Sequence, residues 1–222
     1  MASRETELAG LWRALTVNEA ATQRVFDSVV EGMTPDQMQA IFVAEVRRRG
    51  IDGHVSGAAF VVGKGGAGPK LRTKQPLKTG DLFGMDFQFA SEGFYADIGR
   101  YAVFGPPSAD LAARHTRVLE TQREIADAIR PGEPIRRAFE KCPDGWTIEA
   151  HRIGTDVHMD PMFSTVKTDN RLDVIVEVGM VMCVEIWKGF DGGIEDQYLV
   201  TERGLDRLTT LPRELIDARR RP

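Results

Sequence analysis

The sequence has few cysteines and lacks a long apolar run. Its 222 residues include two cysteines, Cys142 and Cys183, whose spacing fits neither a disulfide framework nor a thiolate zinc site. We therefore predict two separate buried or half-buried thiols. No stretch reaches the length of a transmembrane helix, and Arg4, Glu5 and Glu7 stand where a signal peptide would need an apolar segment. The sequence predicts a cytoplasmic protein without membrane contact.

An excess of positive charge is also absent. The chain has 29 basic and 33 acidic residues and a formal net charge of −4, which argues against a partner that is a nucleic acid. The apolar fraction of 42% and the charged fraction of 28% are typical of soluble globular proteins. Without a low-complexity linker, we expect residues 1–222 to form a single domain. A homodimer is expected because that is the commonest symmetric assembly.

Apolar periodicity and turn residues divide the chain into helices and strands. The pattern predicts helices over residues 4–31, 35–50, 109–130 and 135–141. It predicts strands over residues 58–62, 82–89, 94–104, 173–178, 180–186 and 195–200. The order of helix, turn with Gly or Pro, short helix and strands therefore occurs twice. This order fits an internal duplication with α+β architecture, although any two helical hairpins share such punctuation.

Five side chains with oxygen or nitrogen donors lie in short apolar stretches that are typical of strands. Carboxylates are costly in such places unless a positive charge compensates them. A pair of divalent cations would provide that charge. Four carboxylates and one imidazole form a hard ligand set, which suits Mn, Fe, Co or Zn and differs from a thiolate zinc site. The five residues are Asp86, Asp97, His151, Glu185 and Glu195.

The spacing of these residues favours convergence. Asp86 and Asp97 lie on two predicted strands joined by the turn at residues 91–93, and a hairpin brings such a pair to one point. His151 and His158 flank a glycine turn, so both imidazoles can face one cleft.

Four segments carry a family resemblance when they are taken in order. They are Gly80–Asp86, Gly93–Arg100, His151–Pro161 and Gly179–Glu185. Together they resemble the motifs of the pita-bread metallopeptidases of the M24 type, which include methionine aminopeptidase, aminopeptidase P, prolidase and creatinase. The resemblance implies the α+β pita-bread fold. In this fold two duplicated helix–helix–strand halves, related by a pseudo-two-fold axis, are arranged around a curved antiparallel sheet. It also favours a real internal repeat.

The resemblance further implies roles for individual residues. The carboxylate at Glu185 would shuttle a proton in addition to binding metal. The imidazole of His158 would steady the substrate carbonyl or the oxyanion. The ligands implied for the two metal ions are Asp86, Asp97, His151, Glu185 and Glu195.

The chain departs from the family pattern near the substrate. Lys70 stands about where most active members have a further histidine, and it is either an anchor for a substrate carboxylate or a solvated loop lysine. Ile186 follows the predicted metal ligand where peptidases usually have proline. We also expect no counterpart of the N-terminal domain of creatinase-type relatives. Candidate walls of the altered cleft are Phe60, Trp187 and Tyr198.

Three functions remain open from the sequence. The first is a dinuclear metal hydrolase that acts on an amide, a dipeptide or another small C–N substrate. The second is a repurposed enzyme of the same fold that performs a lyase, decarboxylase or cyclisation step on a small metabolite, which the missing histidine favours. The third is a non-catalytic binding module, and the retention of all five ligands argues against it.

Overall fold

The computed structural model describes residues 4–62 and 75–219, apart from the side chains of residues 4–6 and 190. The helices are α1 (Arg4–Phe26), α2 (Pro35–Arg48), α3 (Ala109–Ala128) and α4 (Arg136–Phe139), and a 3-10 helix, η1, spans Gly189–Asp191. The strands are β1 (Val55–Val61), β2 (Leu82–Ser91), β3 (Phe94–Val103), β4 (Thr147–Ile153), β5 (Met159–Ser164), β6 (Val181–Trp187), β7 (Gly193–Thr201), β8 (Gly204–Arg207) and β9 (Ile216–Asp217). None of the helices in these ranges has both the length and the apolar character needed to cross a bilayer.

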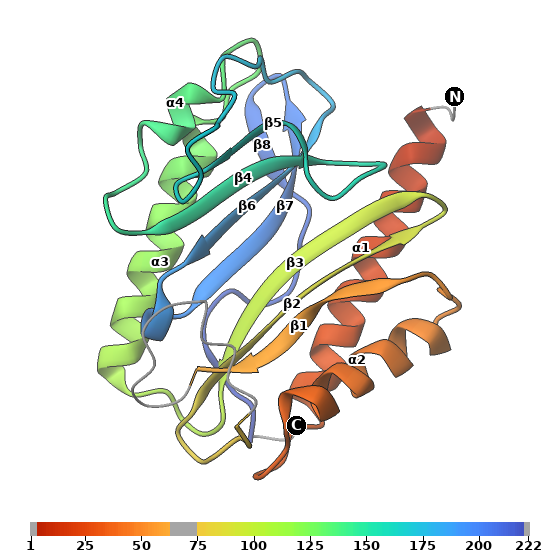
Figure 1. The fold of residues 1–222 in the computed structure, drawn as a ribbon, viewed down its shortest axis with the longest axis vertical. Helices are drawn as coiled ribbons and strands as arrows, with labels where there is room; N and C mark the ends of the chain where they lie inside the picture. Colours follow the sequence, from red (N-terminus) through yellow and green to blue (C-terminus); the bar gives the residue numbers. More distant parts are fainter. Residues whose placement is uncertain (1–3, 63–74, 220–222) are drawn as a thin grey trace.

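One curved sheet connects all of the strands. Its order is β1-β2-β3-β7-β6-β4-β5, with β8 attached to β7 and β9 attached to β3 (Figure 1). Every pairing is antiparallel except that of β3 with β9. Strands β3 and β7 share one registered pair, Gly99 opposite Glu195, and this pair joins the N-terminal strands to the C-terminal ones.

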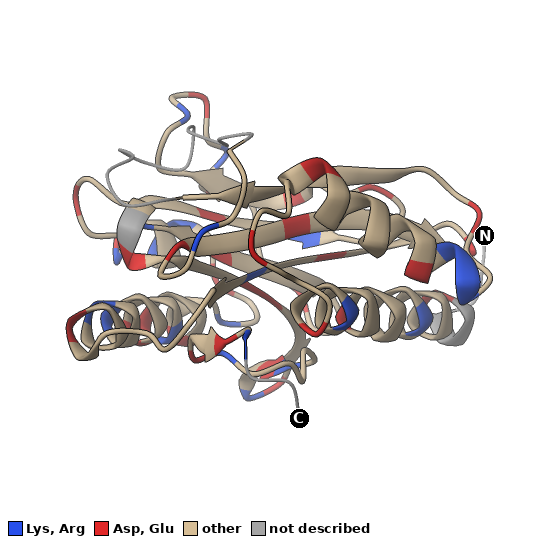
Figure 2. Ribbon diagram, turned by 90° about the horizontal axis from the view of Figure 1, so that it is seen from below, with Lys and Arg blue, Asp and Glu red and all other residues tan. Residues whose placement is uncertain are grey.

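The long helices cover one face of the sheet. Figure 2 shows two of them side by side beneath it, where α1 packs on β2 and β3 while α3 packs on β6 and β7. Each helix seals an apolar core, and the alternation of the strands sends every second side chain into it. Helix pair and strands thus recur twice along the chain, as the pita-bread fold requires.

Local sequence signals explain where two helices begin. Thr34 caps α2: its hydroxyl oxygen accepts a hydrogen bond from the backbone amide of Gln37, and its own backbone amide donates to Gln37 Oε1. This reciprocal arrangement is a capping box, and Pro35 fits the first turn because it has no amide hydrogen to leave unpaired. Ser108 caps α3 by accepting a hydrogen bond from the Leu111 amide at 3.1 Å.

The hairpin between β2 and β3 sets the register of the first two acidic residues. Its two-residue turn consists of Glu92 and Gly93, which both have positive φ angles, of 54° and 86°. Such a turn matches the twist of the flanking strands. It places Asp86 opposite Gly99 and Asp97 opposite Gln88, so both acids point to the same face.

Two of the predicted segments differ in the structure, and the strands β4, β5, β8 and β9 are absent from the predicted set. Residues 173–178 do not join the sheet: the amides of Gly132 and Ile135 donate to the carbonyls of Val176 and Val174, so the segment pairs with the loop before α4. Of its apolar residues, Val176 is buried, whereas Ile175 and Val178 are exposed. The predicted helix over residues 4–31 ends earlier, at Phe26.

Candidate metal centre

A row of acidic side chains crosses the sheet. Asp86 on β2 is opposite Gly99 on β3, and Gly99 is opposite Glu195 on β7. Glu195 is opposite Glu185 on β6, which in turn is opposite Glu149 on β4. Directly opposed residues in a sheet point to the same face, so these five positions form one line, the carboxylate row. Like charges this close are unfavourable without a cation among them.

A second row lies beside it, two residues along each strand. His151 on β4 is opposite Cys183 on β6, and Cys183 is opposite Gln197 on β7. Asp97 is two residues from Gly99 and therefore faces the same side. Both rows lie on the face of the sheet away from the long helices. On β6, for example, the intervening residues Met182 and Val184 point the other way, into the core under α3.

The two rows bring the predicted ligands together. Asp86, Asp97 and Glu195 each offer an oxygen within 4.8 Å of the others. His151 joins Glu195, with 3.7 Å between Nε2 and Oε1. Glu185 forms a neighbouring group with Glu149 and His158, also within 4.8 Å. The structure therefore places the sequence-predicted residues at one location.

The two imidazoles lie on either side of the β4–β5 turn. The ring centroids of His151 and His158 are 4.6 Å apart, and His158 is solvent-exposed whereas His151 is fully buried. Asp97 completes a group with both of them. The imidazole of His158 is therefore open to solvent, while that of His151 is not. Lys70, the other predicted catalytic residue, lies outside the described residues.

The buried donors at this centre lack partners among the described residues. Asp97 Oδ1, His151 Nε2 and both carboxylate oxygens of Glu195 make no hydrogen bond there. All three side chains are buried, and unpaired polar atoms in such places are costly. Oxygen and nitrogen donors that converge without partners fit a hard divalent cation.

The same burial perturbs the pKa values of these groups. Burial, together with the charges of Asp86 and Glu149, raises the pKa of Glu185 to about 8. Burial and the neighbouring carboxylates also hold the pKa values of Asp97 and Glu195 well above the usual range. Burial lowers the pKa of His151 to about 3, so this imidazole is neutral at pH 7 and offers a lone pair.

An aromatic wall borders the carboxylate row. Trp187 donates its indole N–H to Glu185 Oε2. Its ring also lies over Gly99, where an added Cβ would come within 2.9 Å of the ring. Phe60 and Tyr101 pack against this indole, with centroid distances of 6.1 and 5.8 Å. Phe60 and Trp187, two of the predicted wall residues, thus pack beside the carboxylate row, and their role as cleft walls stays a prediction.

Tyr198, the third predicted wall residue, does not line the site. It is buried in the core cluster under α3. The alternation of β7 explains the difference, because Tyr198 is an odd number of residues from Glu195 and points to the opposite face.

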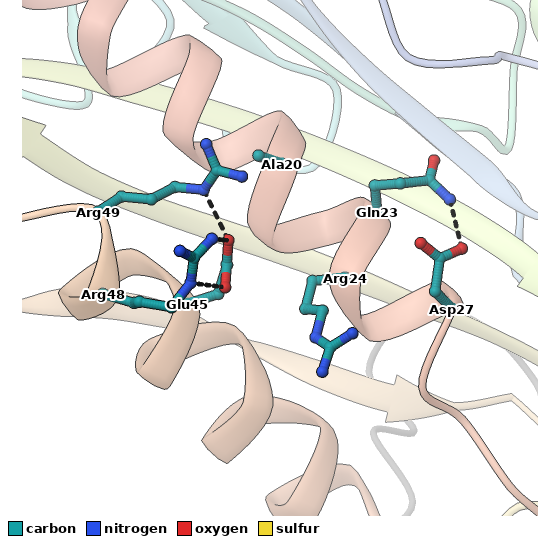
Figure 3. A pocket seen from close by; sticks show the side chains of 7 residues that line it. All are labelled: Ala20, Gln23, Arg24, Asp27, Glu45, Arg48 and Arg49. Carbon is teal, nitrogen blue, oxygen red and sulfur yellow. Dashed lines mark hydrogen bonds and ion pairs between the residues drawn. The ribbon is translucent and has the colours of Figure 1, made fainter.

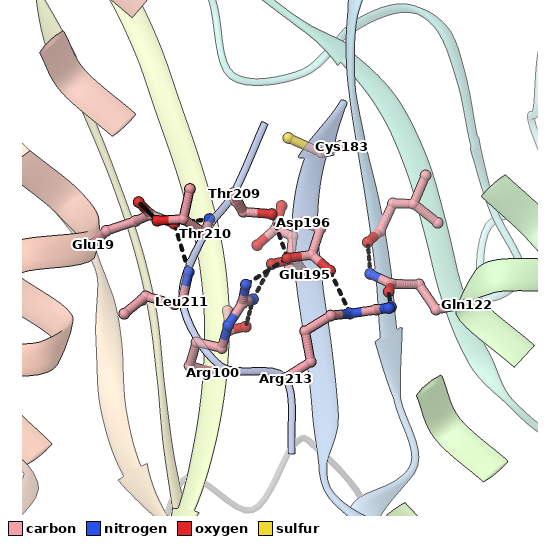
Figure 4. A network of polar contacts seen from close by, with 12 residues as sticks. Glu19, Arg100, Gln122, Cys183, Glu195, Asp196, Thr209, Thr210, Leu211 and Arg213 are labelled. Carbon is pink, nitrogen blue, oxygen red and sulfur yellow. Dashed lines mark hydrogen bonds and ion pairs between the residues drawn. The ribbon is translucent and has the colours of Figure 1, made fainter. Parts of the chain in front are cut away.

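A buried ionic network lies behind the centre (Figure 4). Arg100 donates to the backbone carbonyl of Glu195 and to the carboxylate of Asp196. The same carboxylate accepts from Thr209 and lies 3.1 Å from Arg213 Nε. The C-terminal segment is thereby fastened to β3 and β7, and the network fixes the backbone that carries Glu195.

A separate polar hollow of about 540 Å³ lies between α1 and α2 (Figure 3). One of its lining residues is Glu45, whose carboxylate accepts hydrogen bonds from Arg48 and Arg49. These bonds lower the pKa of Glu45 to about 2. The arginines are therefore engaged in a helix-end ion pair, and the hollow lies on elements that contribute no residue to the centre.

Two residues of the centre are not among the sequence predictions. Glu149 and Cys183 each lie two positions before a predicted ligand, His151 and Glu185 respectively, on the same strand. Residues two apart on a strand share a face. Strand alternation around each predicted ligand was therefore the signal that could have found both.

Comparison with curated proteins finds peptidases. The chain is 31% identical over 154 residues to the uncharacterised peptidase YqhT of Bacillus subtilis, covering 63% of this chain and 42% of the relative. It is 25% identical over 225 residues to an Xaa-Pro dipeptidase of Pyrococcus furiosus, covering 95% and 63%. The chain therefore spans less than two thirds of the length of either relative.

Solved structures share the fold. An X-Pro aminopeptidase from Thermotoga maritima superposes with a TM-score of 0.75 at 24% identity, over 97% of this chain and 64% of that one. The prolidase from Pyrococcus horikoshii gives a TM-score of 0.71, also at 24% identity, over 96% and 64%. The family model for metallopeptidase family M24 matches residues 9–202, which is most of the sequence. The chain belongs to metallopeptidase family M24.

Proposed function

We propose that this chain carries the active site of a dinuclear metal-dependent hydrolase, which cleaves the amide bond of a dipeptide or another small C–N substrate. The observation that carries the proposal is the convergence of half-buried Asp86 with buried Asp97 and Glu195, within 4.8 Å, on a face shared with His151. Family membership supports it, as do relatives named as peptidases. Because these relatives are named as peptidases, short peptides are the first substrates to test.

The donor set suits two cations that share carboxylates. Asp86, Asp97, Glu195, His151 and Glu185 would hold them, because their atoms surround one region and their charges otherwise repel. Such ions, when bound, polarise the scissile carbonyl and activate water as a nucleophile. Mn, Fe, Co and Zn all accept these ligands.

Two residues of the chain would handle protons and charge. Glu185 takes the proton of the attacking water and returns it to the leaving nitrogen, and the indole of Trp187 holds one of its oxygens in place. His158 lies exposed beside His151 and would donate a hydrogen bond to the carbonyl oxygen as negative charge develops there.

A peptide panel on metal-loaded protein tests this function. The purified chain is loaded anaerobically with Mn²⁺, Fe²⁺, Co²⁺ or Zn²⁺ and incubated with X-Pro and Met-X dipeptides, and released amino acids are measured by chromatography. We expect release that a chelator abolishes and that added metal restores. Bound metal without any cleavage would favour the repurposed enzyme, and failure to bind any metal would favour a binding module.

The role of Lys70 is a separate prediction. If it occupies the place of the family's upstream histidine, Lys70→His should raise peptidase turnover, because imidazole can transfer protons near neutral pH and an ammonium group beside carboxylates cannot. Turnover that persists without a gain would show that position 70 does not correspond to the histidine. Lys64→His, in the same lysine-containing stretch of the sequence, is the matched control.

A further inference from the structure

Cys183 points into the metal centre. It lies on β6 between Met182 and Val184, which both pack in the core under α3, so the thiol projects to the opposite face with Glu185. Its cross-strand neighbours are His151 and Gln197. Figure 4 shows its sulfur on the strand next to Glu195.

The distances place the sulfur among donor atoms. The Cys183 sulfur, a nitrogen of His151 and an oxygen of Glu195 all lie within 4.8 Å of one another, and all three residues are at most 1% exposed. The thiol lies 3.9 Å from the Asp97 carbonyl and beside the Glu195 carboxylate, and it also packs in the apolar core cluster that contains the α1 side chains. The Nε2 of His151 and both oxygens of Glu195 lack hydrogen-bond partners among the described residues.

The spacing of the other two donors fits a shared ion. Two ligand atoms about 2.1 Å from one tetrahedral cation lie roughly 3.4 Å apart. His151 Nε2 and Glu195 Oε1 are 3.7 Å apart. A small buried cysteine often serves as an apolar filler. At this position, however, it faces an imidazole and a carboxylate whose donor atoms are unpaired.

We propose that the Cys183 thiolate is a direct ligand, with His151 and Glu195, to one of the two cations. This inference depends on the metal centre of the proposed function and adds a soft donor to it. When the ion binds, the thiol releases its proton to solvent and the sulfur forms the bond to the metal. Thiolate ligands favour Zn²⁺ and Co²⁺ over Mn²⁺, so the site should prefer the softer ions.

Cobalt spectroscopy tests the ligand directly and without substrate. The full chain is titrated with Co²⁺, and bound cobalt is counted by elemental analysis while the near-ultraviolet spectrum is recorded. We expect a thiolate-to-cobalt charge-transfer band in the wild type and in Cys142→Ser, which removes the only other thiol. Cys183→Ser should bind cobalt without this band.

The outcomes separate the ligand from the function. Bound cobalt without the band in wild-type protein would overturn the thiolate ligand and leave the proposed hydrolase standing. No bound cobalt would overturn both. If Cys183→Ser is not folded, Cys183→Ala is measured in its place, and the wild-type spectrum remains decisive by itself.

Metal competition gives a second measure. Cys183→Ser should lose at least about tenfold in Zn²⁺ affinity, the lower end of the effect of disturbing a metal site's supporting residues. Its Mn²⁺ affinity should not change, because manganese prefers oxygen ligands. Equal losses for the two ions, or none, would count against a sulfur–metal bond.

Discussion

Asp97 is 4% exposed, and its Oδ1 has no hydrogen-bond partner among the described residues. Burial and the charges of Asp86 and Glu185 raise its pKa. In the absence of a cation this carboxyl group therefore destabilises the fold, and with cations it becomes a ligand. Removing it should thus affect metal binding and intrinsic stability in opposite directions.

We expect Asp97→Ala to lower the metal content of the protein and to abolish hydrolysis. Metal-free Asp97→Ala should be at least as stable to urea as metal-free wild type, because the substitution removes a buried group without a partner. Elemental analysis and urea unfolding measure the two effects. Asp206→Ala, at an exposed position on β8, is the matched control. Unchanged metal stoichiometry would remove Asp97 from the ligand set.

At the residue scale, the sequence identified the donor residues of the centre better than the residues that surround them. The predicted donors converge because each lies at a fixed parity on a strand with an apolar alternation. Glu149 and Cys183 were missed because the prediction did not follow strand alternation two residues back from His151 and Glu185. Tyr198 was misplaced because its odd spacing from Glu195, which sends it to the opposite face, was not taken into account.

Asp196 links three elements of the structure. Its carboxylate is fully buried and contacts Arg100 on β3 and both Thr209 and Arg213 in the C-terminal segment. The charge of Arg100 and these hydrogen bonds outweigh burial and lower its pKa. Removing one partner from a buried ionic network is costly because it leaves the remaining buried charges uncompensated.

We expect Asp196→Asn to reduce the free energy of unfolding by about 3–5 kcal/mol, because it leaves buried guanidinium groups without a full counter-charge. Urea unfolding of metal-free protein measures the loss. Asp206→Asn, exposed on the neighbouring strand β8, should be neutral within about 0.5 kcal/mol. Equal stabilities of the two variants would mean that the network is not required for the fold.

Whole elements were predicted where apolar periodicity and turn residues agree. Strands β2, β3, β6 and β7 were located within a few residues, and the predicted helix over residues 35–50 begins where α2 does. Residues 173–178 show why an apolar extended stretch alone can be wrong: this segment bonds through its backbone to the loop before α4 and buries Val176 without joining the sheet. The order of strands in the sheet depends on long-range pairing, which local sequence does not encode.

For the whole molecule, we expect the free energy of unfolding to depend strongly on pH only when no metal is bound. Glu185 has its pKa raised to about 8, so the folded state binds a proton that the unfolded state has released. Stability from this group is complete below its unfolded pKa of 4.5 and is lost as pH rises through 8. His151, whose folded pKa is about 3, opposes this trend only below 6.5.

We therefore expect the unfolding free energy of metal-free protein to fall between pH 6.5 and 8. One carboxyl group over this window accounts for a loss on the order of 2 kcal/mol. Thermal or urea unfolding across this range measures it. Saturating Mn²⁺ should flatten the profile, since a bound cation compensates the ionised carboxylates. A metal-free protein that gains stability over the window would contradict the burial of these acids.

The narrow junction between β3 and β7 has a consequence for dynamics. Asp86 and Asp97 stand on one side of it, and His151, Glu185 and Glu195 on the other, while a single registered pair spans the gap. Metal ions bound by ligands from both sides would hold the two sides of this junction together. Amide hydrogen exchange should then be fastest along the junction in chelated protein, and it should slow there first when a cation is added.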